Sequence, residues 1–347
     1  MKSLLLTDLH LSNKSFKGVS LLDYQVDCIN SIIEKEKPHE IIIMGDIFTQ
    51  RRPSPSALLA LKGIVDRSRK YASSVIMLRG NHDSETKSDD GVTALSLFND
   101  YEVLAGRFVK VVTHTHVCYK TARMFIPHYE NQETILKALK DAPAGFEIFG
   151  HFGFVGCLNS AGDKDFDISP SNFNNITYLG HIHKHIVEWN GEHPITVVGT
   201  PYTTNFGEEG KASFYGVKGE VEEYYEFKSI DCGPHHMGIT YKNLIKDFKG
   251  FKKSINESKF SVLLRIVLEK DDVVDHSVLD ELDVVYMDFR FSPIEEKDCQ
   301  DQSEYRPERN LFSINDQIIE DYVEKHNSSL DKEEIMWGLG ILKNEDK

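Results

Sequence analysis

Five short motifs rich in carboxylate, imidazole and amide side chains occur in the first half of the chain. They are Asp8-x-His10, Gly45-Asp46, Gly80-Asn81-His82-Asp83, Gly150-His151 and Gly180-His181-Ile182-His183. This mixture of oxygen and nitrogen ligands suits borderline divalent metals such as manganese, iron or zinc better than an all-oxygen calcium site. Divalent metals lower the pKa of bound water and so provide hydroxide near neutral pH. The motifs therefore predict a hydrolytic metal centre.

Each motif taken alone has an ordinary explanation. A single histidine beside an apolar strand is more often hydrogen-bonded in the core than bound to a metal, and residues 80–83 are compatible with a simple Asx turn. With 15 histidines in the chain, two Gly-His pairs are unremarkable. The order and the placement of the motifs favour a metal site, because each one ends a predicted strand. Strand ends of an open α/β sheet lie together and bind ligands there.

The elements that position these motifs follow from the pattern of apolar residues. Up to about residue 230, short apolar runs alternate with amphipathic stretches, which is typical of an α/β domain. Buried strands are predicted at 3–6, 40–44, 73–78, 147–150 and 176–180. Helices are predicted over about 21–33 and 58–65, the second with Ser54 or Ser56 as its N-cap. Hairpins separated by glycines after residue 180 predict a second sheet.

The rest of the chain divides into smaller parts. Residues 1–232 form the predicted main domain, and 233–292 form a small α+β domain with strands at 262–268 and 284–291 and a helix near 275–283. Residues 293–310 are polar and read as a linker. Apolar residues at helical spacing in 311–347 predict a tail of two short helices. These helices either fold back on the protein or form a hairpin that binds a partner.

The charge distribution leaves nucleic acid open as a partner. The net charge is −15, but residues 269–347 hold 23 of the 55 acidic residues and only 9 of the 40 basic ones. The first 268 residues are therefore almost neutral. Arg51 and Arg52 are candidate substrate-binding residues through phosphate contacts. A second basic cluster, which is also compatible with a solvated helix face, comprises Lys242, Lys246, Lys249, Lys252 and Lys253.

Cysteine spacing and hydropathy suggest the cellular compartment. The five cysteines lie far apart without a CxxC pair, so we expect reduced thiols, no disulfide and no structural zinc. No apolar run reaches 18 residues, and Asp8 and His10 interrupt the apolar opening of the chain. We therefore expect a cytoplasmic protein without a signal peptide or membrane association.

The ordered motifs resemble those of the calcineurin-like metallophosphoesterase superfamily over about residues 1–230. The resemblance implies a two-sheet sandwich flanked by helices, followed here by a small capping domain and a helical tail. It also implies two divalent metals that share an aspartate. The implied ligands are Asp8, His10, Asp46 and His183 for one metal, and Asp46, Asn81, His151 and His181 for the other.

The same resemblance implies roles in catalysis for two further residues. His82 would remain free of metal and face the scissile phosphate, where it would stabilise negative charge or protonate the leaving oxygen. Asp83 would hold the ring of His82 by a hydrogen bond. The spacing of His181 and His183 fits this scheme, because alternate residues of an extended segment point the same way and can serve neighbouring metals.

Two segments resemble the SbcD-type DNA-repair nuclease branch of that superfamily. They are GDIFTQRRPSPSALLAL (45–61) and GTPYTTNFGEEGKASFYGV (199–217). The branch implies manganese, a homodimer, 3′ to 5′ digestion and a C-terminal helical hairpin that docks on an SbcC-like SMC/ABC-type ATPase. The compact length is similar to that of bacteriophage recombination-endonuclease small subunits, which would work in the host cytoplasm. Thr49 departs from the pattern, because many members of the branch have His or Asp there.

Three functions remain in competition. The first is a manganese-dependent DNA exonuclease/endonuclease subunit that works with an ATPase in recombination and repair. The second is a stand-alone metallophosphodiesterase for small diesters, which needs no chain of 115 residues after position 232. The third is an interaction scaffold that has lost its metals, which is at odds with a chain that fills every ligand position of the family.

Overall fold

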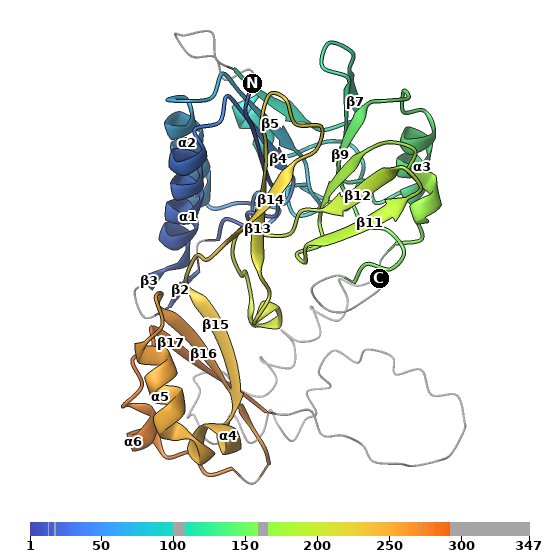
Figure 1. Cartoon of the computed structure of the whole chain (residues 1–347). Helices are drawn as coiled ribbons and strands as arrows, with labels where there is room; N and C mark the ends of the chain where they lie inside the picture. Colours follow the sequence, from blue (N-terminus) through green and yellow to red (C-terminus); the bar gives the residue numbers. More distant parts are fainter. Residues whose placement is uncertain (13, 17–18, 100–107, 159–165, 271, 292–347) are drawn as a thin grey trace, which may run out of the picture. The chain divides into compact units, whose positions relative to one another are not determined.

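The computed structural model describes residues 1–291 apart from 13, 17–18, 100–107, 159–165 and 271 (Figure 1). Met1–Ser292 form one compact unit. The predicted linker at 293–310 and the predicted helical tail at 311–347 lie outside the described residues.

Two six-stranded sheets form the main body. The first has the order β14-β13-β1-β4-β5-β6 and the second the order β11-β12-β10-β9-β8-β7. The strands of the first sheet are β1 (Ser3–Leu6), β4 (Glu40–Met44), β5 (Ser74–Leu78), β6 (Phe108–Val112), β13 (Ser213–Lys218) and β14 (Glu226–Ile230). Those of the second are β7 (His116–Cys118), β8 (Arg123–Ile126), β9 (Glu147–His151), β10 (Thr177–Gly180), β11 (Ile186–Asn190) and β12 (His193–Val197). The predicted fold class, a two-sheet mixed α/β sandwich, is confirmed.

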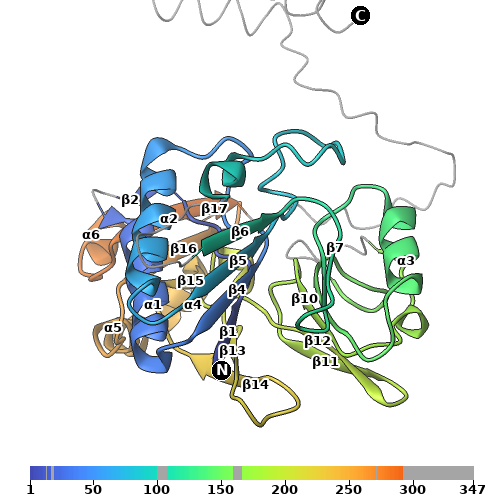
Figure 2. The ribbon, with the colours of Figure 1, turned by 90° about the horizontal axis from the view of Figure 1, so that it is seen from above.

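Helices cover the outer faces of the two sheets (Figure 2). They are α1 (Leu21–Glu36) and α2 (Pro55–Ser68) on the first sheet, and α3 (Gln132–Lys140) on the second. Ser54, one of the two predicted candidates, is the N-cap of α2, because its side chain accepts a hydrogen bond from the amide of Ala57 at 3.2 Å. Short 3₁₀ helices lie at Ala94–Phe98, Pro170–Asn172 and Phe206–Glu208, and a two-stranded ribbon joins β2 (Ser15–Phe16) to β3 (Val19–Ser20).

The inner faces of the two sheets meet in one apolar layer. Leu5 and Met44 of the first sheet pack there with Phe149 and Tyr178 of the second, and all four are essentially inaccessible. Fully burying a side chain of this size contributes about 1.5–3 kcal/mol. This layer fixes the strands of both sheets against each other, and with them the loops at the strand ends.

The hairpins after residue 180 are divided between the sheets, which differs from the prediction that they make up a second sheet. β11 and β12 extend the second sheet, whereas β13 pairs antiparallel with β1 in the first, with Leu4 opposite Val217. The predicted strands β9 and β10 also belong to the second sheet. Local hydropathy does not record the pairing of β13 with β1, because these two strands lie more than 200 residues apart in the chain.

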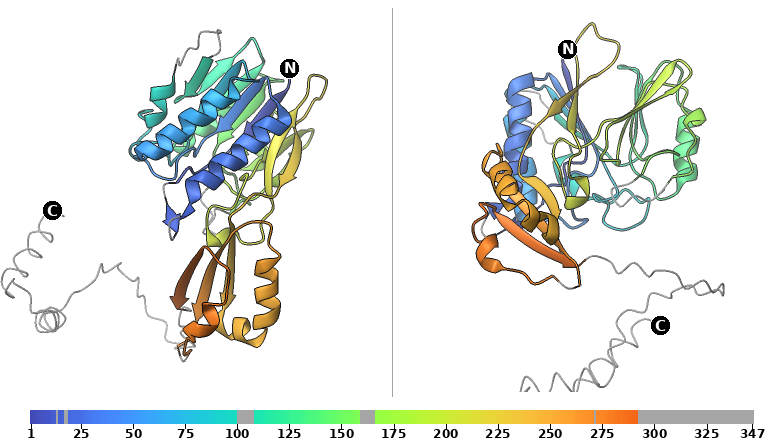
Figure 3. Two further views of the ribbon diagram at one scale, coloured as in Figure 1. Left: turned by 90° about the vertical axis from the view of Figure 1, so that its left-hand side faces the viewer. Right: turned by 60° about the horizontal axis from the view of Figure 1, so that its bottom comes forward.

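A third sheet follows the two main ones. It contains β15 (His235–Thr240), β16 (Val262–Leu268) and β17 (Tyr286–Phe291), all parallel. The helices α4 (Tyr241–Lys246), α5 (Phe248–Asn256) and α6 (His276–Leu279) pack with it around an apolar core of its own that includes Leu244, Leu264 and Ile266 (Figure 3). The predicted strand at 262–268 is present, and the predicted helix at 275–283 is shorter. The domain boundary at 232/233 stays a prediction.

The expectation of reduced cysteines is wrong for one pair. Cys28 of α1 forms a disulfide with Cys232, which follows β14. The spacing in the sequence hides this proximity, because β13 and β14 return to the edge of the first sheet beside β1. Cys118 and Cys157 are free. Within the described part of the chain, no helix is both long and apolar enough to cross a membrane.

Candidate metal centre

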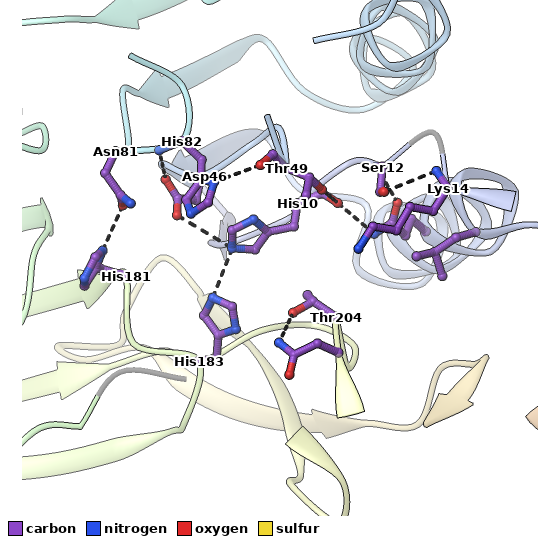
Figure 4. A pocket seen from close by; sticks show the side chains of 13 residues that line it. His10, Ser12, Lys14, Asp46, Thr49, Asn81, His82, His181, His183 and Thr204 are labelled. Atoms are coloured by element: carbon purple, nitrogen blue, oxygen red, sulfur yellow. Dashed lines mark hydrogen bonds and ion pairs between the residues drawn. The ribbon is translucent and has the colours of Figure 1, made fainter. Parts of the chain in front are cut away.

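The predicted metal ligands converge where strands of the two main sheets end, and Figure 4 shows His10, Asp46, Asn81, His181 and His183 among them. The ends of β1, β4 and β5 supply four of them from the first sheet, and the ends of β9 and β10 supply three from the second. The prediction that strand ends build the site therefore holds, with the addition that the strands come from two sheets. These side chains are Asp8, His10, Asp46 and Asn81 from the first sheet, and His151, His181 and His183 from the second.

Four of these residues have a left-handed backbone, which L-amino acids other than glycine seldom adopt. They are Asp8, His10, Asp46 and His181, with φ of 52°, 42°, 49° and 79°. Such conformations cost about 1–3 kcal/mol each and persist where surrounding structure enforces them. Main-chain hydrogen bonds between the loops do so here, from Asp8 N to Gly45 O at 3.0 Å and from His10 N to Asp46 O at 2.9 Å.

Two glycines allow the loops to approach one another closely. A Cβ atom on Gly80 would collide with the backbone and the carboxylate of Asp46. A Cβ atom on Gly45 would collide with the ring of His151, and Gly45 also has a φ of +88°. Glycine at these two positions therefore lets Asp46 lie between the two sheets.

Asp8, His10 and His183 form a first group whose ligand atoms lie within 4.8 Å of one another. Nε2 of His10 is 3.0 Å from Nε2 of His183. Oδ1 of Asp8 is 3.9 Å from Nε2 of His183. The side chain of Thr7 donates a hydrogen bond to the other oxygen of Asp8 at 2.5 Å, which holds the carboxylate in place.

Asp46, His151 and His181 form a second group of the same kind. Nε2 of His151 is 3.2 Å from Oδ1 of Asp46, and its Nδ1 donates to the carbonyl of Met44 at 2.6 Å. The side-chain amide of Asn81 is 3.2 Å from Nε2 of His151 and 2.9 Å from Nδ1 of His181. Asn81 therefore belongs to this second group.

Asp46 reaches both groups. Its Oδ2 is 3.6 Å from Nε2 of His10 in the first group, while its Oδ1 faces His151 in the second. This is the arrangement expected of a carboxylate that bridges two metals. The individual ligand assignments remain predictions, and the structure brings all of their side chains together.

The histidines of the metal-free site differ in their ionisation. Burial lowers the pKa of His10 to about 3 and that of His181 well below its ordinary value, so both rings are neutral and able to bind metal. Burial disfavours a charge on His151, but the carboxylates of Asp46 and Asp8 outweigh it and raise the pKa of His151 to about 9. Buried carboxylates and ring nitrogens that face one another at 3–4 Å fit two divalent metals.

His82 and Asp83 are both present at the site, but not in the predicted relationship. Nδ1 of His82 bonds to the carbonyl of Thr49 at 2.8 Å, and the ring lines the pocket. The buried carboxylate of Asp83 accepts backbone hydrogen bonds from Gly80, Ile47 and Phe48 at 2.9–3.2 Å. The prediction that Asp83 holds the ring of His82 is therefore wrong, because its carboxylate binds these backbone amides and the ring is held by Thr49 instead.

Sequence reasoning missed Glu208 and His128. The carboxylate of Glu208 bonds to Nδ1 of His183, and nothing in the surrounding glycine-rich stretch marks it. The ring of His128 stacks on that of His181 with centroids 5.8 Å apart. Burial lowers the pKa of His128 to about 4, and neither of its ring nitrogens has a hydrogen-bond partner among the described residues.

The predicted phosphate-binding residues lie around the site in different ways. Arg51 donates to the carbonyls of Ser84 at 3.2 Å and Thr86 at 2.6 Å, so it also holds a loop. The side chain of Arg52 is 85% exposed, with Glu85 at 3.7 Å. The second basic cluster lies on α4 and α5. One of its members, Lys252, forms an ion pair with Glu281 at 2.8 Å.

A cavity of about 330 Å³ lies over the ligands. Its walls carry His82, Asn81 and His181 at one end and Lys14 at the other (Figure 4). Two metals bound here would activate water for attack on phosphorus. Because Nδ1 of His82 is bonded to a carbonyl, its Nε2 is left to hold or deliver a proton at the leaving oxygen. The arrangement can therefore hydrolyse a phosphoester.

Comparisons with known proteins identify one family model and several solved structures. The model of the calcineurin-like phosphoesterase family matches residues 1–185. A dimetal phosphatase from Danio rerio is similar in structure, with 11% identity, a TM-score of 0.40, and coverage of 67% of this chain and 96% of that one. The nuclease MPE from Pseudomonas putida has 14% identity and a TM-score of 0.30, with coverage of 65% of this chain and 87% of that one. Vps29 complexed with Zn²⁺ from Entamoeba histolytica has 13% identity and a TM-score of 0.31, with coverage of 67% of this chain and 99% of that one.

No curated protein matches the chain. The assignment rests on the family model, which covers more than half of the sequence, and on the two ligand groups that its motifs bring together. The chain belongs to the calcineurin-like phosphoesterase family.

Proposed function

We propose that this phosphoesterase is a manganese-dependent DNA nuclease that hydrolyses phosphodiester bonds with two metals, as the subunit of a complex with an SMC-like ATPase. The proposal starts from the family of the chain and from the two groups of candidate metal ligands. The donor set of imidazole nitrogens with carboxylate and amide oxygens is compatible with manganese, which is the metal that the SbcD-type resemblance implies. The choice of DNA rests on the shape and charge of the cavity over the ligands.

The observation that carries the proposal is the position of Lys14. This lysine lines the end of the cavity opposite Asn81 and His181 (Figure 4). A DNA strand carries a phosphate on each side of the one being cut, so a cation at the far end of the same cavity has a natural partner. A small diester has no second phosphate for Lys14 to bind.

Other features support a polynucleotide substrate. The remaining walls of the cavity are mostly polar, with Ser12, Gln25 and Asn205 among them. A second cavity of about 370 Å³ also borders on His181 and is lined by Arg51 and Lys87 as well as Phe166. Cations beside an aromatic ring suit a nucleotide, because the ring can stack on a base.

The test compares two substrates for one variant. End-labelled DNA and bis(p-nitrophenyl) phosphate are incubated with the chain in manganese or in magnesium. We expect Lys14→Ala to raise KM for DNA about tenfold, which corresponds to about 1.4 kcal/mol, and to leave the small diester unaffected. The slope of log K for DNA binding against log salt concentration should become shallower by about one, because one phosphate contact is lost.

Lys120→Ala is the matched control. Lys120 is exposed in the turn that precedes β8, and this end of the sheet is opposite to the end that carries the candidate ligands. The alternative function, a stand-alone phosphodiesterase for small diesters, predicts that Lys14→Ala and Lys120→Ala behave alike on both substrates. Equal KM values for DNA in the two variants would reject the role of Lys14, and a wild-type chain that cleaves the small diester but no DNA would reject the nuclease proposal.

The partner proposals need their own experiments. Residues 311–347, outside the described part, are proposed to bind the ATPase, so a chain that ends at residue 310 should hydrolyse the small diester normally and fail to co-purify with the ATPase. The homodimer is tested by light scattering of the full chain.

Arg52, with its exposed side chain, is the arginine that we propose to contact phosphate directly.

A further inference from the structure

Glu208 holds one of the candidate metal ligands from behind. Its carboxylate is 1% exposed and bonds to Nδ1 of His183. The opposite ring nitrogen, Nε2, lies 3.0 Å from Nε2 of His10 in the first ligand group. A carboxylate on the rear nitrogen of a metal-binding histidine fixes both the tautomer and the direction of the ring. Glu208 is therefore placed to orient His183.

The carboxylate of Glu208 is itself held by a short loop, residues 203–209. The amide of Thr204 donates to it at 2.7 Å and the hydroxyl of Thr204 at 2.9 Å. The side-chain amide of Asn205 adds a third hydrogen bond at 2.9 Å. Hydrogen bonds to a charged acceptor are stronger than neutral ones, so the carboxylate cannot turn unless the loop moves.

The third sheet holds this loop at its middle. Phe206 lies in the loop, and the guanidinium carbon of Arg265 on β16 is 4.1 Å from the centre of its ring. The ring of His236 on β15 meets Phe206 edge to face at 4.9 Å. A guanidinium over an aromatic ring contributes about 0.5–2 kcal/mol, with the higher values in desolvated positions.

The same sheet also holds both ends of the loop. Nδ1 of His236 is 3.0 Å from the hydroxyl of Thr203, and the amide of Gly238 donates to Glu209 at 2.6 Å. Arg265 is fixed in turn by Asp288 on β17, whose Oδ2 accepts from Nε at 3.1 Å and from Nη2 at 2.9 Å. The loop that presents Glu208 is thus attached to the third sheet at three points.

We propose that the third sheet is part of the metal centre: Arg265 and Glu208 are positioning residues that set the direction of His183 and so the affinity of the first ligand group for its metal. Contacts run from Asp288 through Arg265 and Phe206 to the loop, and from Glu208 to His183. The inference rests on the two-metal site of the proposed function and is independent of DNA as the substrate.

The experiment titrates Mn²⁺ alone into the chelator-treated full chain by calorimetry. We expect two sites in the wild type. Arg265→Ala should weaken one of them measurably, by less than the roughly 10- to 100-fold range for loss of a partner bonded directly to a ligand, and leave the other within about twofold. Glu208→Gln should weaken the same site, and the double variant should be no weaker than Glu208→Gln, because both changes act through one path.

Arg290→Ala is the matched control. Arg290 donates to the same oxygen of Asp288 at 3.2 Å, but it lies on β17, one strand farther from β15, and its side chain is 65% exposed. The Arg290→Ala chain should bind Mn²⁺ like the wild type. Phe206→Leu provides a second test that leaves the ion pair of Arg265 and Asp288 intact, and it should weaken the same site as Arg265→Ala.

The outcomes separate this proposal from the function on which it rests. A wild-type chain that binds fewer than two Mn²⁺ ions would overturn the two-metal function itself. A wild type with two sites, together with Arg265→Ala and Phe206→Leu chains that keep both affinities, would overturn the positioning role of the third sheet alone. Circular dichroism of each variant checks that its fold is intact.

Discussion

The carbonyl of Thr49 accepts a hydrogen bond from Nδ1 of His82 at 2.8 Å. A carbonyl can only accept, so this contact places a hydrogen on Nδ1 and leaves Nε2 facing the cavity. The side chain of Thr49 donates to the carbonyl of His10 at 2.7 Å, which ties the loop after β4 to the loop after β1. Thr49 thus contacts His82 through its main chain and the loop after β1 through its side chain.

His82→Ala is expected to lower kcat on bis(p-nitrophenyl) phosphate about 10²- to 10⁴-fold, the usual contribution of a general acid. Manganese content should not change, because the ring of His82 is held by Thr49 and lies outside both ligand groups. Turnover and metal stoichiometry are measured on the same preparation. His193→Ala, at the start of β12 and so at the far end of the second sheet, is the control. Wild-type turnover in His82→Ala would reject the role of His82 as a general acid.

Asp46→Ala is expected to lose both metals. One carboxylate oxygen faces His10 and the other faces His151, so each ligand group loses a member. Elemental analysis after dialysis against Mn²⁺ measures the loss, with Asp66→Ala on the exposed side of α2 as the control. Two manganese ions per chain in Asp46→Ala would contradict the bridging assignment.

The strands and motifs of the site could be predicted because their signals are local. β1, β4 and β5 are short apolar runs, each followed within a few residues by a polar ligand. Glu208 and His128 carry no such signal, since their importance depends on contacts with His183 and His181 that only the fold creates. The pairing of β13 with β1 and the Cys28–Cys232 disulfide were unpredictable for the same reason.

Asp83 shows the limit of reasoning from residue type. A carboxylate next to a catalytic histidine suggests a partner for its ring, yet Asp83 accepts three backbone amides instead. Asp83→Asn should therefore lower the free energy of unfolding by about 1–3 kcal/mol, because the introduced NH₂ faces a donor and leaves buried amides unpaired. Urea unfolding of the metal-free chain measures this change against Asp66→Asn. An unchanged unfolding midpoint would show that the loops do not depend on this carboxylate.

Glu36 offers a test of pH-dependent stability far from the metal ligands. Its buried carboxylate accepts hydrogen bonds from Lys2 at 2.7 Å, Tyr215 at 2.8 Å and Lys228 at 3.3 Å. Burial alone would raise its pKa, but these three donors outweigh burial and hold the pKa of Glu36 below its ordinary value. The folded state therefore binds this proton less readily than the unfolded state does, so the carboxylate stabilises the fold at neutral pH.

This stabilisation should disappear as the pH falls through the lowered pKa of the folded state. Glu36→Gln is expected to cost about 1–2 kcal/mol of unfolding free energy at pH 7, and the difference from the wild type should shrink once the pH drops below the ordinary range of a glutamate. Urea unfolding at a series of pH values, in chelator, measures it. Glu226→Gln is the control, because its side chain is 72% exposed and 3.8 Å from the same Lys228. A difference that stays constant down to acid pH would show that the charge of Glu36 contributes nothing, and that its shape alone matters.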